Sequence, residues 1–306
     1  MQFHAQFPHQ SLEKLYKKLA DRDLEDIDVI RHIESIFIKK RGYVFRKLKP
    51  GTRVVFQISG GIDSVITASI LMKRFGLVLY PLFLRRGQSR VKQEEASVDY
   101  FSKIFVKQFP NHFYPVFKME TRIPPFEIRA TLIANSNNKV VSGSERRWGI
   151  PMYASLLTSY AVEYAYYLEE EHNLKIRTIL CAAIESDSIQ MAHHSLTGLR
   201  GIMLNICTQT NDYRWQFTSP WIEKELGYYV AKKDLIRWGW LQHLPIHRSW
   251  SCYLKGIFHC GRCNGCWSRK QAFIDAKVVD RTQYRDTMTD IDILKSICFS
   301  FLDTKS

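Results

Sequence analysis

The feature that most constrains the fold is a glycine-rich loop between a short apolar run and a helical pattern. Residues 53–58 read RVVFQI, which is typical of a buried parallel strand, and residues 59–64 (SGGIDS) follow at once. A helical pattern from Val65 to Phe75 comes next, and Leu77 to Leu84 forms a second apolar run. This strand–loop–helix–strand order predicts a doubly wound α/β fold whose sheet is mostly parallel.

The rest of the chain continues the alternation and divides into three parts. We expect a helical N-terminal extension over residues 1–50, an α/β domain over residues 51–245, and a cysteine-bearing segment with further helices over residues 246–306. In the extension, Ser11 can cap a first helix, and apolar spacing predicts a second from Glu25 to Lys40. Other patterns predict helices at 93–105, 151–171 and 231–238 and a buried strand at 176–183.

The loop SGGIDS has the features of an anion-binding site. Gly60 and Gly61 let the backbone approach an anion closely, and the following helix directs its free N–H groups at the same point. The hydroxyls of Ser59 and Ser64 can add donors. Asp63 would repel a bare phosphate, so it suits a site where it binds Mg²⁺ or orients another group. A Ser/Gly-rich turn that only caps a helix is the structural alternative.

A cluster of four cysteines is the second strong signal. Two overlapping C-x2-C steps and one more distant cysteine can close a tetrahedral shell around structural zinc, with the ligands Cys252, Cys260, Cys263 and Cys266. His259 could replace one ligand, and an iron–sulfur cluster also suits four thiolates. Unligated cysteines are the structural alternative. The remaining cysteines are scattered and lie in no context that would activate a nucleophile; they are Cys181, Cys207 and Cys298.

The strand followed by SGGIDS resembles the SGGxDS signature of PP-loop ATP pyrophosphatases. The resemblance implies an adenine nucleotide alpha hydrolase-like fold. It also implies an enzyme that cleaves ATP between the α- and β-phosphates and adenylates an oxygen of its substrate. On this basis we expect ATP to be bound by the whole loop, which comprises Ser59, Gly60, Gly61, Ile62, Asp63 and Ser64.

The cysteine segment resembles a narrower family, the 7-cyano-7-deazaguanine synthases (QueC family). Their zinc segment reads approximately W-S-C-Y, a short loop, then C-G-x-C-x-x-C-x-x-R-x-x-A-F, and this pattern is matched from Trp250 to Phe273. Weaker matches lie between the two motifs in the family's order, at Gly87-Gln88, Asp187 and Pro220. The resemblance covers residues 53–273 and leaves residues 1–50 without a recognised counterpart.

This resemblance implies an ATP-dependent ligase that forms C–N bonds and uses Mg²⁺ and Zn²⁺. Family members convert 7-carboxy-7-deazaguanine and ammonia through an amide to the nitrile, by way of an acyl-adenylate. The candidate catalytic residues are Asp63, which would handle Mg²⁺ or position ATP, and Lys233, which would neutralise phosphate or carboxylate. Asp187 and Arg200 are the candidates for binding the base and its carboxylate.

The segment after Asp187 departs from the family. Members carry Tyr-Pro-Asp-Cys-Arg there, whereas this chain reads SIQMAHHSLTGLR and keeps only Arg200. An arginine–asparagine pair expected before the long helix has Arg146-Arg147 as its nearest counterpart. We therefore interpret the chain as a divergent paralogue. His193-His194, in the divergent stretch, is either an ordinary polar loop or a pair that binds metal or moves protons.

Because the segment after Asp187 diverges from the family, the amine that accepts the acyl group and the partners of the protein stay open. Some relatives of the family belong to bacterial antiviral systems, where a protein amine could replace ammonia and the basic N-terminal extension could dock that protein. The net charge of +14 also favours a polyanion such as nucleic acid, although a basic surface without a specific partner fits equally well. A tRNA-modifying PP-loop enzyme and a non-catalytic nucleotide sensor are the two other functional hypotheses. A homodimer is one option for the oligomeric state.

Composition excludes two further classes. No apolar run reaches the roughly 18 residues that a membrane-spanning helix needs, and the start MQFHAQFPHQ lacks the layout of a secretion signal. We therefore expect a cytoplasmic protein with no membrane partner.

Overall fold

The computed structural model describes residues 7, 9–121, 125, 127–128 and 152–287. Three features singled out in the sequence lie outside them: Arg146-Arg147, Cys298 and the helices expected near the C-terminal end. The strands are β1 (Arg53–Gln57), β2 (Val78–Arg85), β3 (Phe117–Glu120), β4 (Thr178–Leu180) and β5 (Gln216–Thr218). The α-helices are α1 (Leu12–Ala20), α2 (Ile27–Arg41), α3 (Ile62–Lys73), α4 (Val91–Gln108), α6 (Tyr153–His172), α7 (Glu185–Ser188), α8 (Leu196–Gln209), α9 (Lys232–Leu241) and α10 (Asn264–Ala276), and the short 3-10 helices are η2 (Ala192–His194), η3 (Lys224–Leu226), η4 (Ile246–Arg248) and η5 (Arg285–Thr287).

The five described strands form one parallel sheet in the order β3-β2-β1-β4-β5. Val55 of β1 is in register with Tyr80 of β2 on one side and with Ile179 of β4 on the other. The chain leaves β1 toward β2 and later returns to the opposite side of β1 through β4. The order of the strands therefore reverses between β1 and β4, which is where open α/β sheets place their ligands.

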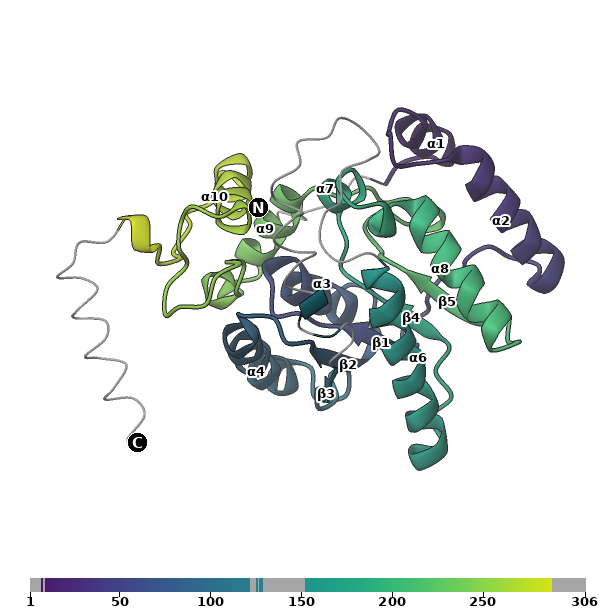
Figure 1. Cartoon of the computed structure of the whole chain (residues 1–306), viewed down its shortest axis with the longest axis horizontal. Helices are drawn as coiled ribbons and strands as arrows, with labels where there is room; N and C mark the ends of the chain where they lie inside the picture. The colour runs from purple at the N-terminus through teal and green to yellow at the C-terminus, as the bar shows by residue number, and fades with distance from the viewer. Residues whose placement is uncertain (1–6, 8, 122–124, 126, 129–151, 288–306) are drawn as a thin grey trace.

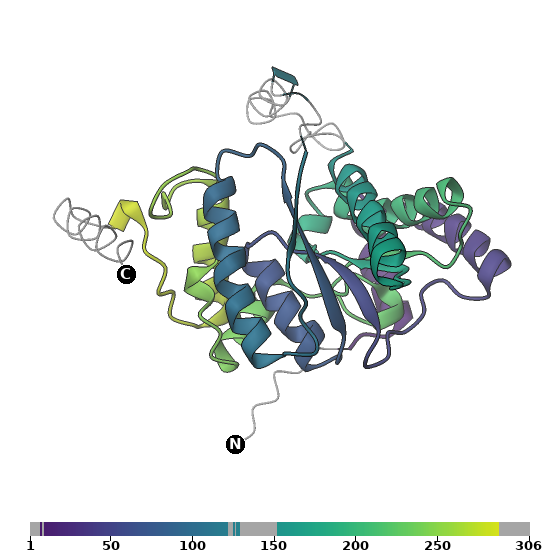
Figure 2. The same cartoon turned by 90° about the horizontal axis from the view of Figure 1, so that it is seen from below.

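Helices cover both faces of this sheet, as Figure 2 shows. Successive side chains of a strand point to opposite faces, and β1 is buried on both. Val54 and Phe56 pack with α3, α4, α9 and α10, whereas Val55 packs with α6, α8 and the two N-terminal helices. The doubly wound α/β fold predicted from the sequence is confirmed, with every described strand pair parallel.

Several elements differ from the sequence prediction in extent. Helix α3 begins at Ile62 rather than Val65, because Gly61 is its N-cap and the end of the loop forms its first turn. Strand β4 is shorter than predicted, since it pairs over two residues with β1 and over three with β5. The sequence patterns did not predict β3 and β5, the short strands at the two edges of the sheet, or helix α8. Helix α8 contains two glycines, which weaken its helical pattern.

The N-terminal helices are integrated into the core rather than appended to it. Apolar side chains of α1 and α2 belong to the same buried cluster as the sheet residues of β1 and β4; they are Leu15, Leu19, Ile30, Ile33 and Phe37. The carboxylate of Glu25 accepts hydrogen bonds from the backbone N–H groups of Leu196 and Thr197 at 2.8 and 2.9 Å, so it caps the start of α8. Figure 1 shows α1 and α2 beside α8, on the opposite side of the sheet from α10.

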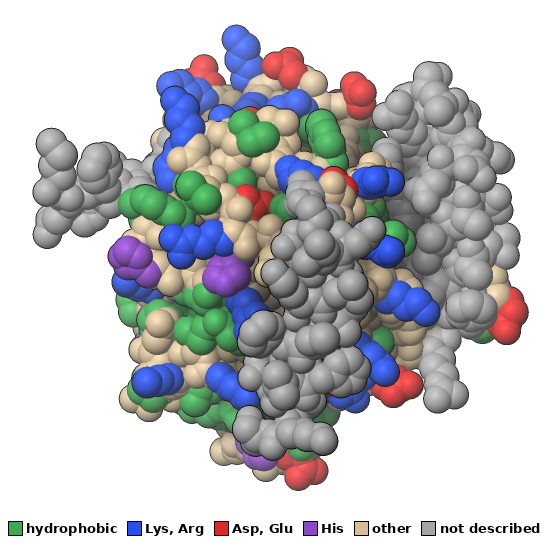
Figure 3. All heavy atoms as spheres, turned by 90° about the vertical axis from the view of Figure 1, so that its left-hand side faces the viewer, with side chains coloured by type: hydrophobic (Ala, Val, Ile, Leu, Met, Phe, Trp, Pro, Cys, Tyr) green, Lys and Arg blue, Asp and Glu red, His purple; other side chains and the backbone are tan. Residues whose placement is uncertain are grey.

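The cysteine-bearing segment also packs on the α/β domain. Helix α10 lies against α9, and its side chains Ala272 and Phe273 join the cluster that contains α3 and β1. On the part of the exposed face of this C-terminal lobe that the structure describes, Lys and Arg side chains lie dispersed among apolar ones (Figure 3). Within the part of the chain that the structure describes, no helix has the length and hydropathy needed to cross a membrane.

Candidate functional site

A large cavity of about 1190 Å³ lies at the carboxyl ends of the parallel strands. Its walls come from the residues that follow β1, β2 and β4, from the start of α9, and from one side of α10. The N-terminal segment contributes Asp23 and Leu24 to the same cavity. This volume is at the upper end of the range for small-molecule sites, so the cavity has room for a nucleotide and a second substrate.

The loop predicted from SGGIDS lines this cavity at the N-terminus of α3. Five of its six residues face the cavity, all except Gly60. The hydroxyls of Ser59 and Ser64 lie 3.1 Å apart, and the Ser64 hydroxyl also donates to the carbonyl oxygen of Gly61 at 3.0 Å. Gly61 makes no side-chain cap, so the first N–H groups of α3 remain free to bind an anion.

Gly60 is the residue that lets the loop turn. Its φ angle is +73°, and a Cβ atom there would lie 2.4 Å from the backbone oxygen of Glu94. The carbonyl oxygen of Gly60 accepts two hydrogen bonds, from the hydroxyl of Ser97 at 2.7 Å and from the backbone N–H of Trp250 at 3.0 Å. The loop is therefore held from helix α4 on one side and from the segment before the cysteines on the other.

Two carboxylates and one ammonium group form the charged floor of the cavity. Lys232 donates to Oδ2 of Asp63 at 3.0 Å, and Asp187 interacts electrostatically with both. Burial raises the pKa values of Asp63 and Asp187, and it is opposed in each case by Lys232. Burial lowers the pKa of Lys232, but the two carboxylates outweigh it and raise that pKa, so the lysine stays charged. One positive charge faces two acids, and the cluster can accept a further cation.

Lys233 and Arg200 do not take the positions that were predicted for them from the sequence. Lys233 lines the cavity but is exposed, and its neighbour Lys232 makes the contact with Asp63. Arg200 does not line the cavity: it is fully buried in the core, where it donates to Glu34 at 2.8 Å and to both oxygens of Glu223 at 2.8 and 2.6 Å. Because it is fully buried and each of its three nitrogens donates to a protein carboxylate, Arg200 is not available to a substrate.

Two further arginines lie at the cavity, after β2. Arg86 and Arg90 share the buried carboxylate of Glu94, with nitrogen–oxygen distances of 4.0 and 2.5 Å. Their guanidinium groups lie over the rings of Tyr153 and Tyr253, at 4.9 and 5.0 Å from the ring centroids. All five side chains line the cavity, so this wall is positively charged and aromatic.

The segment from Glu185 to His194 forms the wall on the far side of the strand-order reversal. Asp187, at the start of this segment, accepts a hydrogen bond from the backbone N–H of Ile184 at 3.1 Å, which fixes its carboxylate next to the end of β4. Asp187 lies in α7, from which Glu185 and Ser186 also line the cavity, and the wall continues through residues 189–191 to His194 of η2. Cys181 also lies in the wall, where burial raises the pKa of its thiol to about 12.

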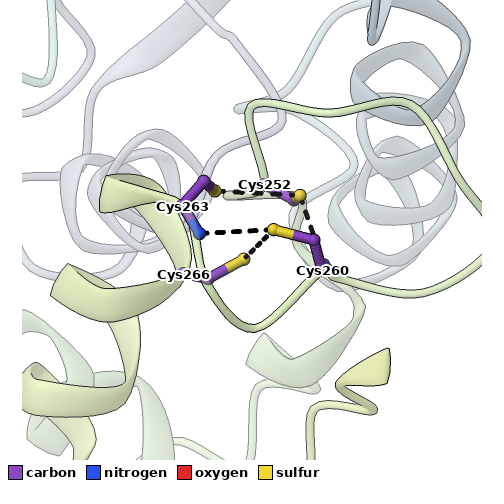
Figure 4. Close-up of side chains that lie close together, drawn as sticks. All are labelled: Cys252, Cys260, Cys263 and Cys266. Carbon is purple, nitrogen blue, oxygen red and sulfur yellow. Dashed lines mark hydrogen bonds between the residues drawn. The ribbon is translucent and has the colours of Figure 1, made fainter. Parts of the chain in front are cut away.

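The four predicted cysteines converge, as Figure 4 shows. Their sulfur atoms all lie within 4.8 Å of one another, with 3.8 Å between Cys260 and Cys266 and 3.9 Å between Cys252 and Cys263. Backbone N–H groups donate to these sulfurs, among them those of Leu254 and Cys263 at 3.4 and 3.3 Å. The group can hold one metal ion. His259 is not part of it, because its Nε2 accepts from the backbone N–H of Ser251 at 3.1 Å.

Arg269 connects the cysteine group to the phosphate loop. It is fully buried, and its guanidinium donates to the backbone oxygen of Ile246 at 2.8 Å and to the hydroxyls of Ser249 and Ser251 at 2.9 and 3.0 Å. These residues flank Trp250, whose backbone N–H donates to Gly60. The arginine on α10 thereby sets the position of the segment around Trp250, which supports the loop.

Comparison with known proteins points to one family. The family model described as "Queuosine biosynthesis protein QueC" matches residues 53–277. A curated 7-cyano-7-deazaguanine synthase from Methanothrix thermoacetophila is 25% identical over 240 residues, which cover 76% of this chain and 99% of that protein. A second, from Sinorhizobium fredii, is 46% identical over 57 residues, or 19% of this chain and 24% of that protein. These matches confirm the resemblance found in the sequence and agree with a divergent member.

Two solved structures show a more distant likeness. The U34-tRNA thiolase NcsA from Methanococcus maripaludis, determined with its 4Fe-4S cluster, is 12% identical with a TM-score of 0.35, covering 80% of this chain and 71% of its own. An NH3-dependent NAD synthetase from Campylobacter jejuni is 12% identical with a TM-score of 0.33, covering 77% of this chain and 75% of its own. The assignment of the fold rests on the strand order and not on these scores.

Proposed function

The chain belongs to the QueC family, and on that basis we propose that it uses ATP to activate a carboxylate on a 7-deazaguanine and joins the acyl group to an amine. The observation that carries the proposal is the convergence on one cavity of the phosphate loop, the Asp63–Lys232–Asp187 cluster and the arginine wall. A site for a polyanion therefore adjoins a site that can hold a second, acidic substrate.

The reaction follows from the weakness of a carboxylate as an electrophile. An oxygen of the carboxylate attacks the α-phosphorus of ATP, the bond between the α- and β-phosphates breaks, and pyrophosphate leaves. An amine then attacks the acyl carbon, the bond to AMP breaks, and the amine loses a proton. The N–H groups at the start of α3 and the ammonium group of Lys232 stabilise negative charge as pyrophosphate departs. Lys233, exposed at the cavity, adds positive charge at its entrance.

Asp63 at the cavity floor fits Mg²⁺. Its Oδ1 is buried and has no hydrogen-bond partner among the described residues, while its other oxygen pairs with Lys232. Hard oxygen ligands of this kind are those that Mg²⁺ prefers, and Asp63 would hold the ion at the phosphate loop. When bound, Mg²⁺ neutralises charge on the phosphate oxygens. Asp187, which is anchored beside the end of β4, is then free to bind N–H groups of the base.

We assign zinc to the four-cysteine group. Zinc–sulfur bonds of about 2.3 Å in a tetrahedron place the sulfurs about 3.8 Å apart, and two of the sulfur–sulfur distances in the group are 3.8 and 3.9 Å. An iron–sulfur cluster inserts several atoms between its thiolates and needs a wider group. Four protein ligands leave no open position, so the zinc is structural. One zinc per chain in colourless protein supports the assignment, and brown protein containing iron would overturn it.

The test is mass spectrometry of a reaction that contains the purified protein, ATP, Mg²⁺, ammonia and 7-carboxy-7-deazaguanine. We expect AMP and pyrophosphate to form together with the amide or the nitrile, whose masses differ by one water. The Asp63→Asn variant is the control, since it keeps the shape of the side chain and removes the carboxylate. A folded protein that binds ATP but leaves the acid unchanged would refute the choice of substrate.

The same reaction, together with a measurement of tRNA binding, separates the other hypotheses. A protein amine as acceptor, the hypothesis drawn from the antiviral relatives, would appear as acyl mass added to a protein when ammonia is withheld. A nucleotide sensor would bind ATP without forming AMP. A tRNA-modifying enzyme would bind tRNA with an affinity that falls steeply with salt. A tRNA-modifying enzyme of this class typically needs a reactive cysteine. The high pKa of Cys181 keeps the thiol in the cavity protonated, which argues against this hypothesis.

A further inference from the structure

The divergent wall of the cavity contains a histidine whose role is not explained by the chemistry above. His194 is the last residue of η2 and lines the cavity, whereas its neighbour His193 does not. The two rings meet edge to face with their centroids 4.5 Å apart. Burial lowers the pKa of His194 to about 4, with no contribution from a carboxylate. The ring is therefore neutral at pH 7.

The backbone around His194 is firmly held. Its N–H donates to the carbonyl oxygen of Met191 at 2.8 Å, and the N–H of Met191 donates to that of Asp187 at 2.9 Å. A Cβ atom on Gly198 of α8 would lie 2.1 Å from the carbonyl oxygen of Ala192, so helix and turn are in close contact. Glu25 caps the start of α8 from the N-terminal side. A side chain on such a support keeps one orientation, which is what recognition of a ligand requires.

The two ring nitrogens of His194 have different surroundings. Nδ1 is buried and has no hydrogen-bond partner among the described residues, whereas Nε2 is not one of the buried atoms that lack a partner. The residue lines the cavity, where Nε2 can meet a ligand. A neutral imidazole carries one proton. A proton on Nδ1 would create a buried N–H without an acceptor, which is costly. We therefore assign the proton to Nε2, so that His194 presents a donor to the cavity.

We propose that His194 is a specificity residue that donates a hydrogen bond from Nε2 to an acceptor on the ring of the substrate. For the 7-deazaguanine of the proposed function, on which this inference rests, that acceptor is the 6-oxo oxygen. The wall then offers complementary groups: Asp187 can accept from the N–H groups of the base, and His194 donates to its oxygen. The carboxylate at position 7 remains free to reach ATP at the phosphate loop.

The experiment compares two acids, 7-carboxy-7-deazaguanine and its analogue with hydrogen in place of the 6-oxo group. Acid-dependent AMP formation is measured for the unaltered protein and for His194→Phe and His194→Gln. We expect His194→Phe to lower kcat/KM for the 6-oxo acid about 10-fold, mainly through KM, and to leave kcat/KM for the analogue unchanged. His194→Gln retains an N–H donor near the position of Nε2 and should recover most of the loss.

His193→Gln is the matched control, because the same residue type is changed one position away, outside the cavity, and activity should not change. An equal loss for both acids in His194→Phe, or no loss for either, would overturn the inference while the proposed function stands. If His194→Phe does not fold, His194→Gln gives the test. A lower ratio of kcat/KM for the 6-oxo acid to kcat/KM for the analogue in His194→Gln than in the unaltered protein would also overturn the inference. An unaltered protein that does not use the 6-oxo acid at all would overturn both.

Discussion

Replacing Arg200 by methionine tests whether this arginine supports the fold or binds substrate. The guanidinium is fully buried and bridges Glu34 of α2 to Glu223, which precedes η3. Methionine fills most of the same volume and removes the charge. The variant thus leaves two buried carboxylates without their main partner, which is one of the few ways in which a single substitution strongly destabilises a protein.

The magnitude depends on what each carboxylate retains. Glu34 keeps the ammonium group of Lys224 at 3.0 Å, so its charge stays compensated. Glu223 loses both of its bonds to Arg200 and keeps only neutral donors, the hydroxyl of Thr218 at 2.7 Å and a backbone N–H. One uncompensated buried charge corresponds to a loss of about 3–5 kcal/mol in the free energy of unfolding. That is a large part of the roughly 5–15 kcal/mol of a typical domain.

The loss should depend on pH in a defined direction. In the unaltered protein burial raises the pKa of Glu223, but Arg200 outweighs it and lowers that pKa below its unfolded value. This contribution is present above a pH of about 4.3 and is lost as pH falls. In the variant, the remaining neutral donors offset burial only in part and the pKa of Glu223 rises. Its charged form is therefore unfavourable at neutral pH, and protonation relieves this cost. The difference in stability between the two proteins should therefore be largest at pH 7 and should narrow as the pH falls toward 5.

The assay is urea denaturation at pH 7 and pH 5, with kcat/KM for the acid measured in parallel at a temperature where both proteins are folded. We expect a lower midpoint with an unchanged slope and an unchanged KM. Adding Glu223→Gln to the variant should restore part of the stability, because it removes the uncompensated charge. A loss below about 1 kcal/mol would refute the reasoning, as would a raised KM in a stably folded variant, which would make Arg200 a substrate residue.

Three other predictions concern the phosphate loop, the lysines and the metal. Gly60→Ala should weaken ATP binding at least about 10-fold, measured by calorimetry, because its Cβ would lie 2.4 Å from a backbone oxygen, while Gly61→Ala, at 3.2 Å from a movable hydroxyl, should weaken it less. Lys232→Met should lower kcat/KM for AMP formation about 100-fold and Lys233→Met much less, and equal losses would contradict the assigned ion pair. Cys263→Ser should reduce the zinc content and the thermal melting temperature together, and full zinc retention would argue against this ligand.

The sequence predicted the parts of the site that are carried by local patterns. The loop from Ser59 to Ser64 and the four cysteines are contiguous motifs whose residue types are required by their own chemistry, and the structure brings each group together as expected. The same holds for the parallel sheet, because buried strands such as β1 are apolar throughout.

Residues that depend on distant partners were harder to predict. Lys232 and Lys233 are adjacent, and only the start of α9 decides which of them reaches Asp63, since neighbours on a helix point about 100° apart. The resemblance to the family motif placed Arg200 among the substrate residues. Its two carboxylate partners lie 166 and 23 positions away in sequence, so no local pattern indicated its structural role. Arg86 and Arg90 could have been recognised as cavity residues from one signal, because they follow directly after a strand that ends at the same edge of the sheet as β1.

The packing of α1 and α2 has a consequence for the order in which the chain folds during synthesis. Their contacts close over long separations, 163 positions from Arg22 to Glu185 and 172 from Arg41 to Tyr213. A ribosome releases these helices long before it makes α8 and β5, against which their apolar sides are buried. Until then Leu19 and Phe37 are exposed to water, so the nascent chain exposes aggregation-prone apolar surface through most of its elongation. We expect its yield in cells to depend on chaperones that bind the first 41 residues.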